Sequence, residues 1–382
     1  MRFIVFGIFF GLFGLIQLFS HHPTYKVWGT GTDHISHSMT VFLFLEHQFE
    51  IYREPVTNLC PIKDSEKITQ FKEKYKIPEK DLRNVCQISP DSRVLFFSWP
   101  EVVRSYPPGE LLVGVPGAIF YAISDDFDMT AIFLAVIYFL TAAGCALLIL
   151  YALRDLKTEV GDITLALICG FFLPMGLDGY YDSIPALFIV LSILYALKEN
   201  NPVKSFLFFA LAGFFHFRYF MYFPLAIWLF YRNRKAMNTP VFWVACYLIL
   251  FTVFTLWLSI PGIKRIPAQN PFLTNPQAAW YQITFILAAV FSILIITKRY
   301  LLASVLFTLI IGIAQSPVAQ PWHMMALLPL LLFPTLDKKP KLLSTYVILV
   351  VFLLALDQML FHSFLAFGSF LPSYLLETIN RF

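Results

Sequence analysis

The sequence predicts an all-α, polytopic membrane protein with about 11 transmembrane helices and a long first external loop that carries interfacial helices. Of the 382 residues, 58% are hydrophobic and 14% are charged, whereas a soluble domain is about 45–50% apolar and about 25% charged. The charges gather in residues 21–108, which carry 11 basic and 11 acidic side chains. We therefore expect one membrane domain over residues 1–382, with residues 21–127 as its external loop.

The first element is an apolar run over residues 3–20 that follows Arg2. It lacks the paired small residues of a signal-peptidase site, so we expect an uncleaved first helix whose N-terminus is cytoplasmic. The other predicted spans are 128–153, 161–177, 182–197, 205–217, 219–231, 239–260, 279–297, 300–315, 321–335 and 342–365.

Basic residues orient these spans, because cytoplasmic loops are enriched in Lys and Arg. With the N-terminus inside, thirteen Lys and Arg fall on cytoplasmic segments. The short outer loops and the tail carry four, namely Arg218, Lys264, Arg265 and Arg381. The bias predicts an N-in, C-out integral membrane protein with its first long loop outside. We expect the membrane to be a bacterial inner membrane, with the site facing the periplasm or the outside.

The external loop has three predicted parts. Residues 37–52 repeat apolar side chains near helical spacing, which indicates an amphipathic helix on the membrane face. The Lys- and Glu-rich segment 63–83 is expected to be a small solvated cap. The apolar run 111–124 is too short for a comfortable crossing and is interpreted as a second interfacial helix. The acidic run 125–128 is expected to cap the next span, with a cation site as the alternative.

Two of the five cysteines, Cys60 and Cys86, lie in this loop, whereas Cys145, Cys169 and Cys246 lie in apolar runs. An oxidising outer compartment favours a disulfide between the two loop cysteines. The segment that they enclose has few large apolar residues, so a covalent link would stabilise it.

Ionisable side chains gather at the predicted outer ends of the spans. Asp33 follows the first span, Asp182 lies in one outer turn, His216 and Arg218 lie in the next, and His323 lies in a third. Ionisable residues at membrane depth are costly and usually functional. Each also has a structural interpretation, because the acids could cap helices and the basic side chains could reach lipid headgroups.

Several classes of function have no support in the sequence. There is no P-loop, GxSxG, HExxH or dinucleotide-binding fingerprint in a suitable context, and no basic, aromatic-rich run typical of nucleic-acid binding. Asp33-His34-x-x-His37 has a spacing compatible with metal ligands. We expect no resident metal or other cofactor, with a divalent cation as the alternative.

Three features of the sequence together resemble the GT-C class of integral-membrane glycosyltransferases, which use polyprenyl-phosphate sugars. They are an early acidic residue of the first external loop (Asp33), a Tyr-Pro-Pro-Gly element (106–109) before a short interfacial helix, and a Gly-x-x-Asp turn (179–182). The resemblance covers about residues 1–235. The chain departs from it at His216-Phe217-Arg218, where many relatives have a Lys-Pro-type element.

The resemblance implies transfer of a sugar from a polyprenyl-phosphate donor in the lipid bilayer to an unidentified acceptor. Asp33 is the expected base, because such transfer needs a group that takes a proton from the acceptor hydroxyl. Arg218, assisted by His216, is expected to bind the donor phosphate, and Asp182 to orient acceptor or sugar hydroxyls. Tyr106 and His323 complete the expected substrate-binding residues.

Two other classes of protein remain open from the sequence. A lipid or solute transporter, such as a flippase, would show inverted repeats and broken helices near the membrane midplane, and neither is evident. A purely structural membrane subunit would leave the clustered Asp, His and Arg residues without a role.

Overall fold

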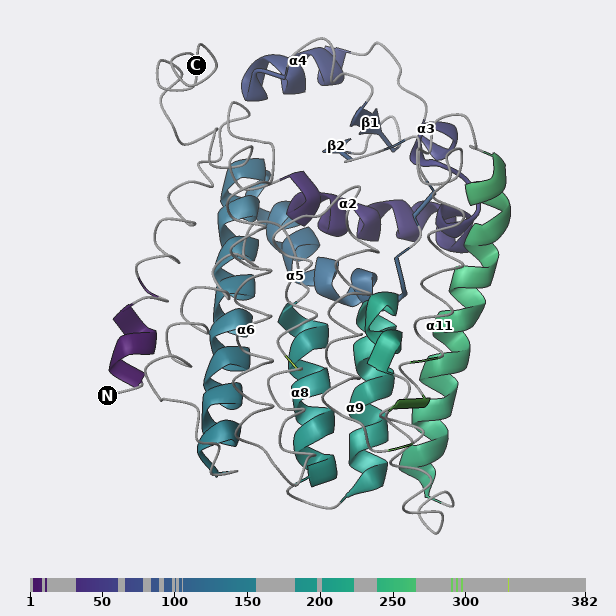
Figure 1. Ribbon diagram of the computed structural model, residues 1–382. Coiled ribbons are helices and arrows are strands. Elements are labelled where there is room, and N and C mark those ends of the chain that lie inside the picture. Colours follow the sequence, from purple (N-terminus) through teal and green to yellow (C-terminus); the bar gives the residue numbers. More distant parts are fainter. Residues whose placement is uncertain are drawn as a thin grey trace, which may run out of the picture. The chain divides into compact units, whose positions relative to one another are not determined.

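The computed structural model in Figure 1 describes residues 3–8, 11, 32–60, 66–77, 84–88, 93–97, 100, 103–104, 106–155, 183–197, 201–222 and 239–265, and the isolated positions 290, 293–294, 297 and 329. This part of the chain is mostly helical. The predicted spans at 161–177, 300–315 and 342–365, and most of those at 3–20, 219–231, 279–297 and 321–335, lie outside the described residues.

The chain divides into two compact units. The loop unit comprises Leu18–Ile137 and Leu250–Asn275, and the helical unit comprises Met1–Gln17, Tyr138–Ile249 and Pro276–Phe382. Two of the boundaries, those after Ile137 and Ile249, fall within the long helices α6 (Phe127–Asp155) and α11 (Pro240–Arg265).

Within the described residues, two helices are long and apolar enough to cross a membrane. They are the segments Phe127–Cys145 of α6 and Pro240–Ser259 of α11, which match the predicted spans at 128–153 and 239–260. Both helices carry large apolar side chains on their exposed faces, such as Ile132 and Leu140 of α6 and Trp243 and Leu250 of α11. These two segments are candidate membrane spans.

In the helical unit, α8 (Ser183–Leu197) packs against α9 (Pro202–Phe215) (Figure 1). Ser192 and Ser205 join the two helices reciprocally, because each hydroxyl donates to the backbone carbonyl of the other at 2.7 Å. Asn201 caps α9 by accepting from the Lys204 amide. Both helices occupy predicted spans, at 182–197 and 205–217, but they are shorter than a full crossing. The 3₁₀ helix η5 (Phe217–Tyr222) follows α9.

The loop unit contains α2 (Thr32–His47), the 3₁₀ helix η2 (Gln48–Tyr52), α3 (Val56–Leu59), α4 (Glu66–Tyr75) and α5 (Gly109–Ser124). It also contains an antiparallel pair of strands, β1 (Val85–Gln87) and β2 (Val94–Phe96), in which Cys86 lies opposite Leu95. The prediction of an all-α chain is therefore wrong at this hairpin. Its strands have only three residues each, too few to give a clear alternating pattern.

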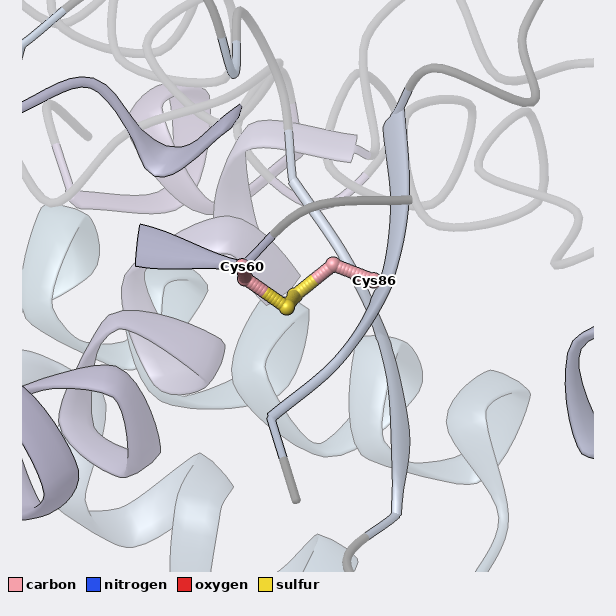
Figure 2. Close-up of a disulfide and its surroundings, with 2 residues drawn as sticks. All are labelled: Cys60 and Cys86. Carbon is pink, nitrogen blue, oxygen red and sulfur yellow. A yellow bond between two sulfur atoms is a disulfide. The ribbon is translucent and has the colours of Figure 1, made fainter. Parts of the chain in front are cut away.

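The predicted disulfide between Cys60 and Cys86 is present (Figure 2). It joins the residue that ends α3 to the middle of β1, and the two Cα atoms are 5.8 Å apart. Both cysteines are buried in the core of the loop unit. The bridge thus closes the segment that carries α4 onto the strands.

The cap within this bridge is not merely solvated, as the sequence suggested. Helix α4 turns Ile68, Phe71 and Tyr75 into the core and leaves its charged side chains outside. The spacing of three and four residues places these side chains on one helical face. Phe71 and Tyr75 pack against Phe127 at the start of α6, with ring centroids 5.8 and 5.4 Å apart.

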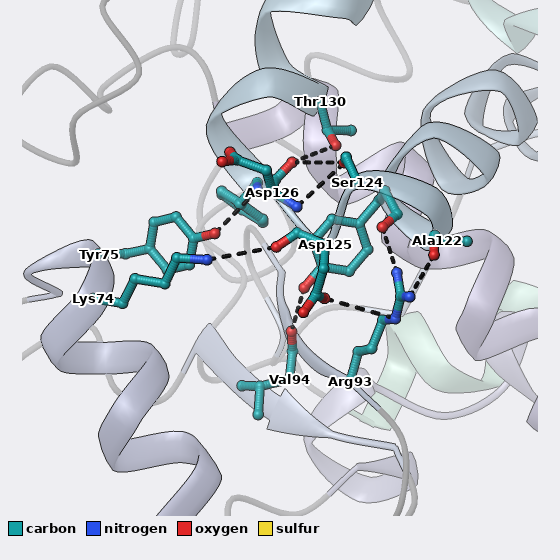
Figure 3. Close-up of polar contacts among 11 residues, drawn as sticks. Lys74, Tyr75, Arg93, Val94, Ala122, Ser124, Asp125, Asp126 and Thr130 are labelled. Atoms are coloured by element: carbon teal, nitrogen blue, oxygen red, sulfur yellow. Dashed lines mark hydrogen bonds and ion pairs between the residues drawn. The ribbon is translucent and has the colours of Figure 1, made fainter.

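Side chains of α4 and of the segment before β2 stabilise the junction between α5 and α6 (Figure 3). Arg93 donates to the last carbonyls of α5, those of Tyr121 and Ala122, and the Tyr75 hydroxyl accepts from the Phe127 amide at 3.0 Å. Asp125 turns the chain in a left-handed conformation, with φ 51°. The predicted cap of α6 is Asp126, whose carboxylate accepts from the Met129 amide at 3.0 Å.

Candidate functional site

Helix α2 crosses the interior of the loop unit in its first half. All six residues from 35 to 40 are buried, which a helix lying on a membrane surface would not show. Ile35, Met39 and Leu43 face the apolar core, while the polar residues between them need internal partners, because burying a polar group without a hydrogen bond is costly. The predicted amphipathic surface helix is therefore an internal helix over these residues. Large exposed apolar side chains begin only at Leu45, near the end of α2, and at Phe49 in η2.

Helix α5 packs against α2 through one buried face, and its other face carries exposed apolar residues. The buried residues recur at intervals of three and four, and are Glu110, Val113, Gly114, Gly117, Ala118 and Tyr121. The other face exposes Leu112, Val115, Ile119 and Ile123. Two glycines let the helix axes approach closely, because a Cβ atom at Gly114 would overlap the backbone carbonyl of His37, and one at Gly117 would overlap the Ser38 hydroxyl.

A methyl group at the α2–α5 contact should therefore destabilise the loop unit. We expect Gly114→Ala to lower the free energy of unfolding by about 2 kcal/mol, since overpacking against backbone cannot be relieved by a side-chain rotation. Chemical denaturation of the purified protein measures the change. Gly144→Ala in α6 is the matched control, because nothing lies within 4 Å of the added Cβ and alanine favours helix. Equal stability of the Gly114 variant and the wild type would contradict the close approach.

Arg104 fastens the chain before α5 to the middle of α2. Its Nη2 donates to the Ser36 carbonyl at 3.0 Å, to the Ser36 hydroxyl at 2.5 Å and to Thr40 Oγ1 at 2.7 Å, and its Nε donates to the same Thr40 oxygen at 3.1 Å. Thr40 Oγ1 in turn donates to the Ser36 carbonyl at 2.7 Å. One guanidinium thus binds Ser36 and Thr40, which are one helical turn apart, because it carries several donors in one plane.

Glu110, the second residue of α5, provides the opposite charge. Its Oε1 lies 3.5 Å from Arg104 Nη2 and 2.5 Å from His37 Nδ1. The Tyr106 ring contacts both partners. It lies edge-on to the His37 imidazole, with 5.2 Å between the ring centroids, and the Arg104 guanidinium lies 6.0 Å from the Tyr106 ring centroid. We refer to Ser36, His37, Thr40, Arg104, Tyr106 and Glu110 as the α2–α5 polar cluster.

All members of the cluster except Tyr106, which is half-buried, are nearly inaccessible to solvent. Arg104 is 6% exposed and Glu110 is 1% exposed, so their charges compensate one another where an isolated charge would be strongly unfavourable. Tyr52, at the end of η2, lies within the field of both. Burial, and after it the negative charge of Glu110, raises the pKa of the Tyr52 hydroxyl well above its ordinary value, while Arg104 acts in the opposite direction. Tyr52 is therefore neutral at physiological pH.

Asp33, the predicted base, lies in the first turn of α2. It precedes Ser36 by three residues, His37 by four and Thr40 by seven, and these intervals place all four positions on one face of a helix. The structure thus brings the Asp33 turn to the same end of α2 as Tyr106. These are two of the residues that the sequence singled out, and they are 73 positions apart in the chain.

The other predicted residues belong to the helical unit or lie outside the described residues. His216 ends α9, is buried, and has its ring 6.2 Å from that of Tyr219. Arg218 follows in η5. Asp182 immediately precedes the first residue of α8, and like His323 it lies outside the described residues. Sequence reasoning placed these residues in one site with Asp33, and the structure describes the two units separately.

Sequence reasoning missed Arg104 and Glu110, although both flank the Tyr106–Gly109 element that it singled out. A local signal was present only for Glu110, which directly precedes the apolar run 111–124. His37 was considered only as a metal ligand, together with Asp33 and His34. Among the side chains that the structure describes, no group of three or more His, Cys, Asp or Glu is placed to hold a metal ion.

Comparisons of the chain with protein-family models, with curated proteins and with solved structures found no match.

Proposed function

We propose that the chain is a GT-C-type glycosyltransferase, which moves a sugar from a polyprenyl-phosphate donor to an acceptor at the outer face of a membrane that the chain crosses about 11 times. One observation supports this most. Helix α2, whose first turn contains Asp33, and the segment that carries the Tyr106–Gly109 element meet in one buried, charged cluster, and these two segments carry the resemblance to that class.

The proposed reaction assigns the proton to Asp33. The carboxylate accepts the proton of the acceptor hydroxyl while the hydroxyl oxygen bonds to the anomeric carbon of the sugar. The bond between that carbon and the phosphate oxygen breaks, and polyprenyl phosphate leaves with the electron pair. The departing phosphate needs a cation, and we assign that role to Arg218 with His216. Asp182, Tyr106 and His323 would orient the two substrates.

The packing of the loop unit agrees with the topology that this function requires. Phe127 at the start of α6 and Leu258 near the end of α11 lie in the same core cluster. The predicted topology puts residues 127 and 260 on one side of the membrane, the side that also carries the first loop. We assign this side to the outside, of a bacterial inner membrane, from the distribution of basic residues.

A direct assay tests the function. The purified protein in lipid is given a polyprenyl-phosphate sugar labelled in the sugar, with extracted envelope material as the source of acceptors. We expect release of polyprenyl phosphate and movement of the label into acceptor or, slowly, into water. Passage of intact labelled lipid between the leaflets of a vesicle, without cleavage, would instead identify a flippase.

Arg218 is expected to act on the donor. Arg218→Ala should raise KM for the lipid-linked donor by about 10- to 100-fold and leave KM for the acceptor unchanged, because loss of a charge-assisted phosphate contact costs about 1.5–3 kcal/mol. Arg218→Lys should recover little, since an ammonium does not replace the planar donors of a guanidinium.

Arg234→Ala is the matched control for this experiment, because it removes an arginine from a predicted cytoplasmic loop. Its donor kinetics should equal those of the wild type. A defect of Arg218→Ala that appears only in acceptor kinetics would contradict the phosphate role.

A further inference from the structure

Helix α5 has an exposed face built from large apolar side chains. Leu112, Val115, Ile119 and Ile123 recur at intervals of three and four residues, so they share one helical face, and Ile123 is 82% exposed. The sequence has no charged residue from 111 to 124. Soluble proteins rarely leave such a continuous apolar surface in water, so this face indicates a nonpolar partner.

Helix α4 of the same unit has the opposite character. Its exposed side chains include Glu66, Lys67, Gln70 and Glu73, while its large apolar side chains lie in the core. One helix of the loop unit is therefore suited to water, and α5 is suited to hydrocarbon. A helix at the headgroup level would carry a charged face opposite its apolar face. In α5 the opposite face is buried against α2 and offers no charge to water.

Contacts with α6 give the depth of α5 (Figure 1). The Phe120 ring stacks on the Phe133 ring with 4.6 Å between the centroids. A Cβ atom at Gly117 would come within 2.9 Å of the methyl carbons of Leu134. Phe133 and Leu134 lie six and seven residues after Phe127, where the candidate span of α6 begins. Because a helix rises about 1.5 Å per residue, α5 contacts α6 about 9–11 Å along its axis from the start of the span.

The ends of α5 are bonded as hydrocarbon surroundings require, since unpaired backbone groups are strongly unfavourable there. At the C-terminal end, the carbonyls of Tyr121 and Ala122 accept from the Arg93 guanidinium. At the N-terminal end, the Glu110 amide donates to the Pro107 carbonyl at 3.0 Å. The Glu110 carboxylate belongs to the α2–α5 polar cluster, where its charge is compensated.

We propose that α5 lies within the hydrocarbon of the bilayer leaflet next to the loop unit, beside α6, with the face that contains Leu112 and Ile119 against lipid acyl chains. This position is deeper than the headgroup level expected of an interfacial helix. In it, α5 separates the buried charges of the α2–α5 polar cluster from the lipid. The inference goes beyond the proposed function and requires only that α6 crosses a bilayer.

Collision rates of spin labels test this position. The three cysteines outside the bridge, Cys145, Cys169 and Cys246, are first replaced by serine. Single labels are then attached through Ile119→Cys in α5, or through control positions, to protein in phosphatidylcholine vesicles. Collisions with oxygen, which concentrates in hydrocarbon, and with a neutral nickel chelate, which stays in water, are measured for each label.

Three control positions calibrate the scale. Gln70→Cys in α4 reports water, while Met129→Cys and Ile132→Cys report two depths on the exposed face of α6. The ratio of oxygen to nickel collisions at Ile119→Cys should exceed that at Gln70→Cys by several-fold. It should equal the ratio at Ile132→Cys and be larger than that at Met129→Cys, because Met129 lies only two residues after the start of the span.

Each other outcome overturns the proposal. A ratio at Ile119→Cys no larger than that at Met129→Cys would place α5 at the headgroup level. Frequent collisions with nickel would show that the face is in water, and few collisions with either reagent would show that protein, such as a second copy of the chain, covers it. An α6 label that reports water would remove the span on which the inference depends.

Folding and activity are kept apart from this result. Intact mass without reductant should show the Cys60–Cys86 bridge in every labelled variant. If Ile119→Cys does not form the bridge, Pro116→Cys takes its place and decides by the same ratios, because Pro116 is also exposed and directly precedes Gly117. No sugar donor is used, so a protein that transfers no sugar would overturn the proposed function and leave this inference intact.

Discussion

Asp33→Asn is expected to lower the turnover of sugar transfer by about 100-fold or more, with the protein still folded. The amide has nearly the shape of the carboxylate, but it cannot accept the proton of the acceptor hydroxyl, and a general base typically contributes about 10²–10⁴-fold. Single-turnover measurements of the purified variant, with donor and acceptor saturating, report the chemical step directly. The loss should appear in kcat, while KM for the donor changes little, because Asp33 is assigned to the acceptor side.

Glu46→Gln is the matched control for this experiment. It neutralises an exposed acid in the last turn of the same helix, α2, and should leave turnover unchanged. Intact mass without reductant should show the Cys60–Cys86 bridge in both variants. If Asp33→Asn turned over at the wild-type rate, Asp33 would be excluded as the base, and His37, one turn further along α2, would be the next residue to test.

Removal of the disulfide is expected to have the largest effect on stability. Cys86→Ser should lower the free energy of unfolding of the loop unit by about 3 kcal/mol, because the bridge closes a segment of 26 residues and so restricts the unfolded chain. For a unit of this size the loss corresponds to about 6–12 °C in the thermal midpoint. Scanning calorimetry or a thermal shift assay in detergent, without reductant, measures it.

Two comparisons make this result specific to the bridge. Treatment of the wild type with a reductant should lower its midpoint to that of Cys86→Ser and leave the variant unchanged. Cys246→Ser changes a free cysteine of α11 and should have little effect. Equal midpoints for oxidised wild type and Cys86→Ser would show that the bridge contributes nothing to stability.

Local elements were predictable wherever one pattern dominated. The starts of α6 and α11 and both ends of α8 follow from apolar runs bounded by polar residues, and the Cys60–Cys86 pair follows from compartment and position. The cap was misjudged because only a few of its residues are apolar. Helix α4 places those few, Ile68, Phe71 and Tyr75, on one face. Composition counts apolar residues but does not show that they share a helical face.

The polar cluster could not be predicted because it depends on long-range pairing. Arg104 lies 68 residues from Ser36, and Glu110 lies 73 residues from His37. Nothing local in either segment identifies its partner. The glycines that make the approach possible, Gly114 and Gly117, read locally as breaks in an apolar helix rather than as the contact itself. Tyr106 and Asp33 were singled out by resemblance, and only the fold shows that they belong to one unit.

The core of the loop unit has a consequence for how the chain is made. Among the described residues, the last member of this core is Leu258, roughly 120 residues after Ile137, where the first stretch of the unit ends. At about 5–20 residues per second, the ribosome needs about 6–24 s to synthesise that stretch. Until then, the apolar side chains of α2, η2 and the cap lack their contacts with α11. Both cysteines of the disulfide are synthesised early. The bridge can therefore restrict the incomplete core before α11 is synthesised. We therefore expect a nascent chain stalled before residue 250 to be oxidised at Cys60 and Cys86 and yet bound by chaperones.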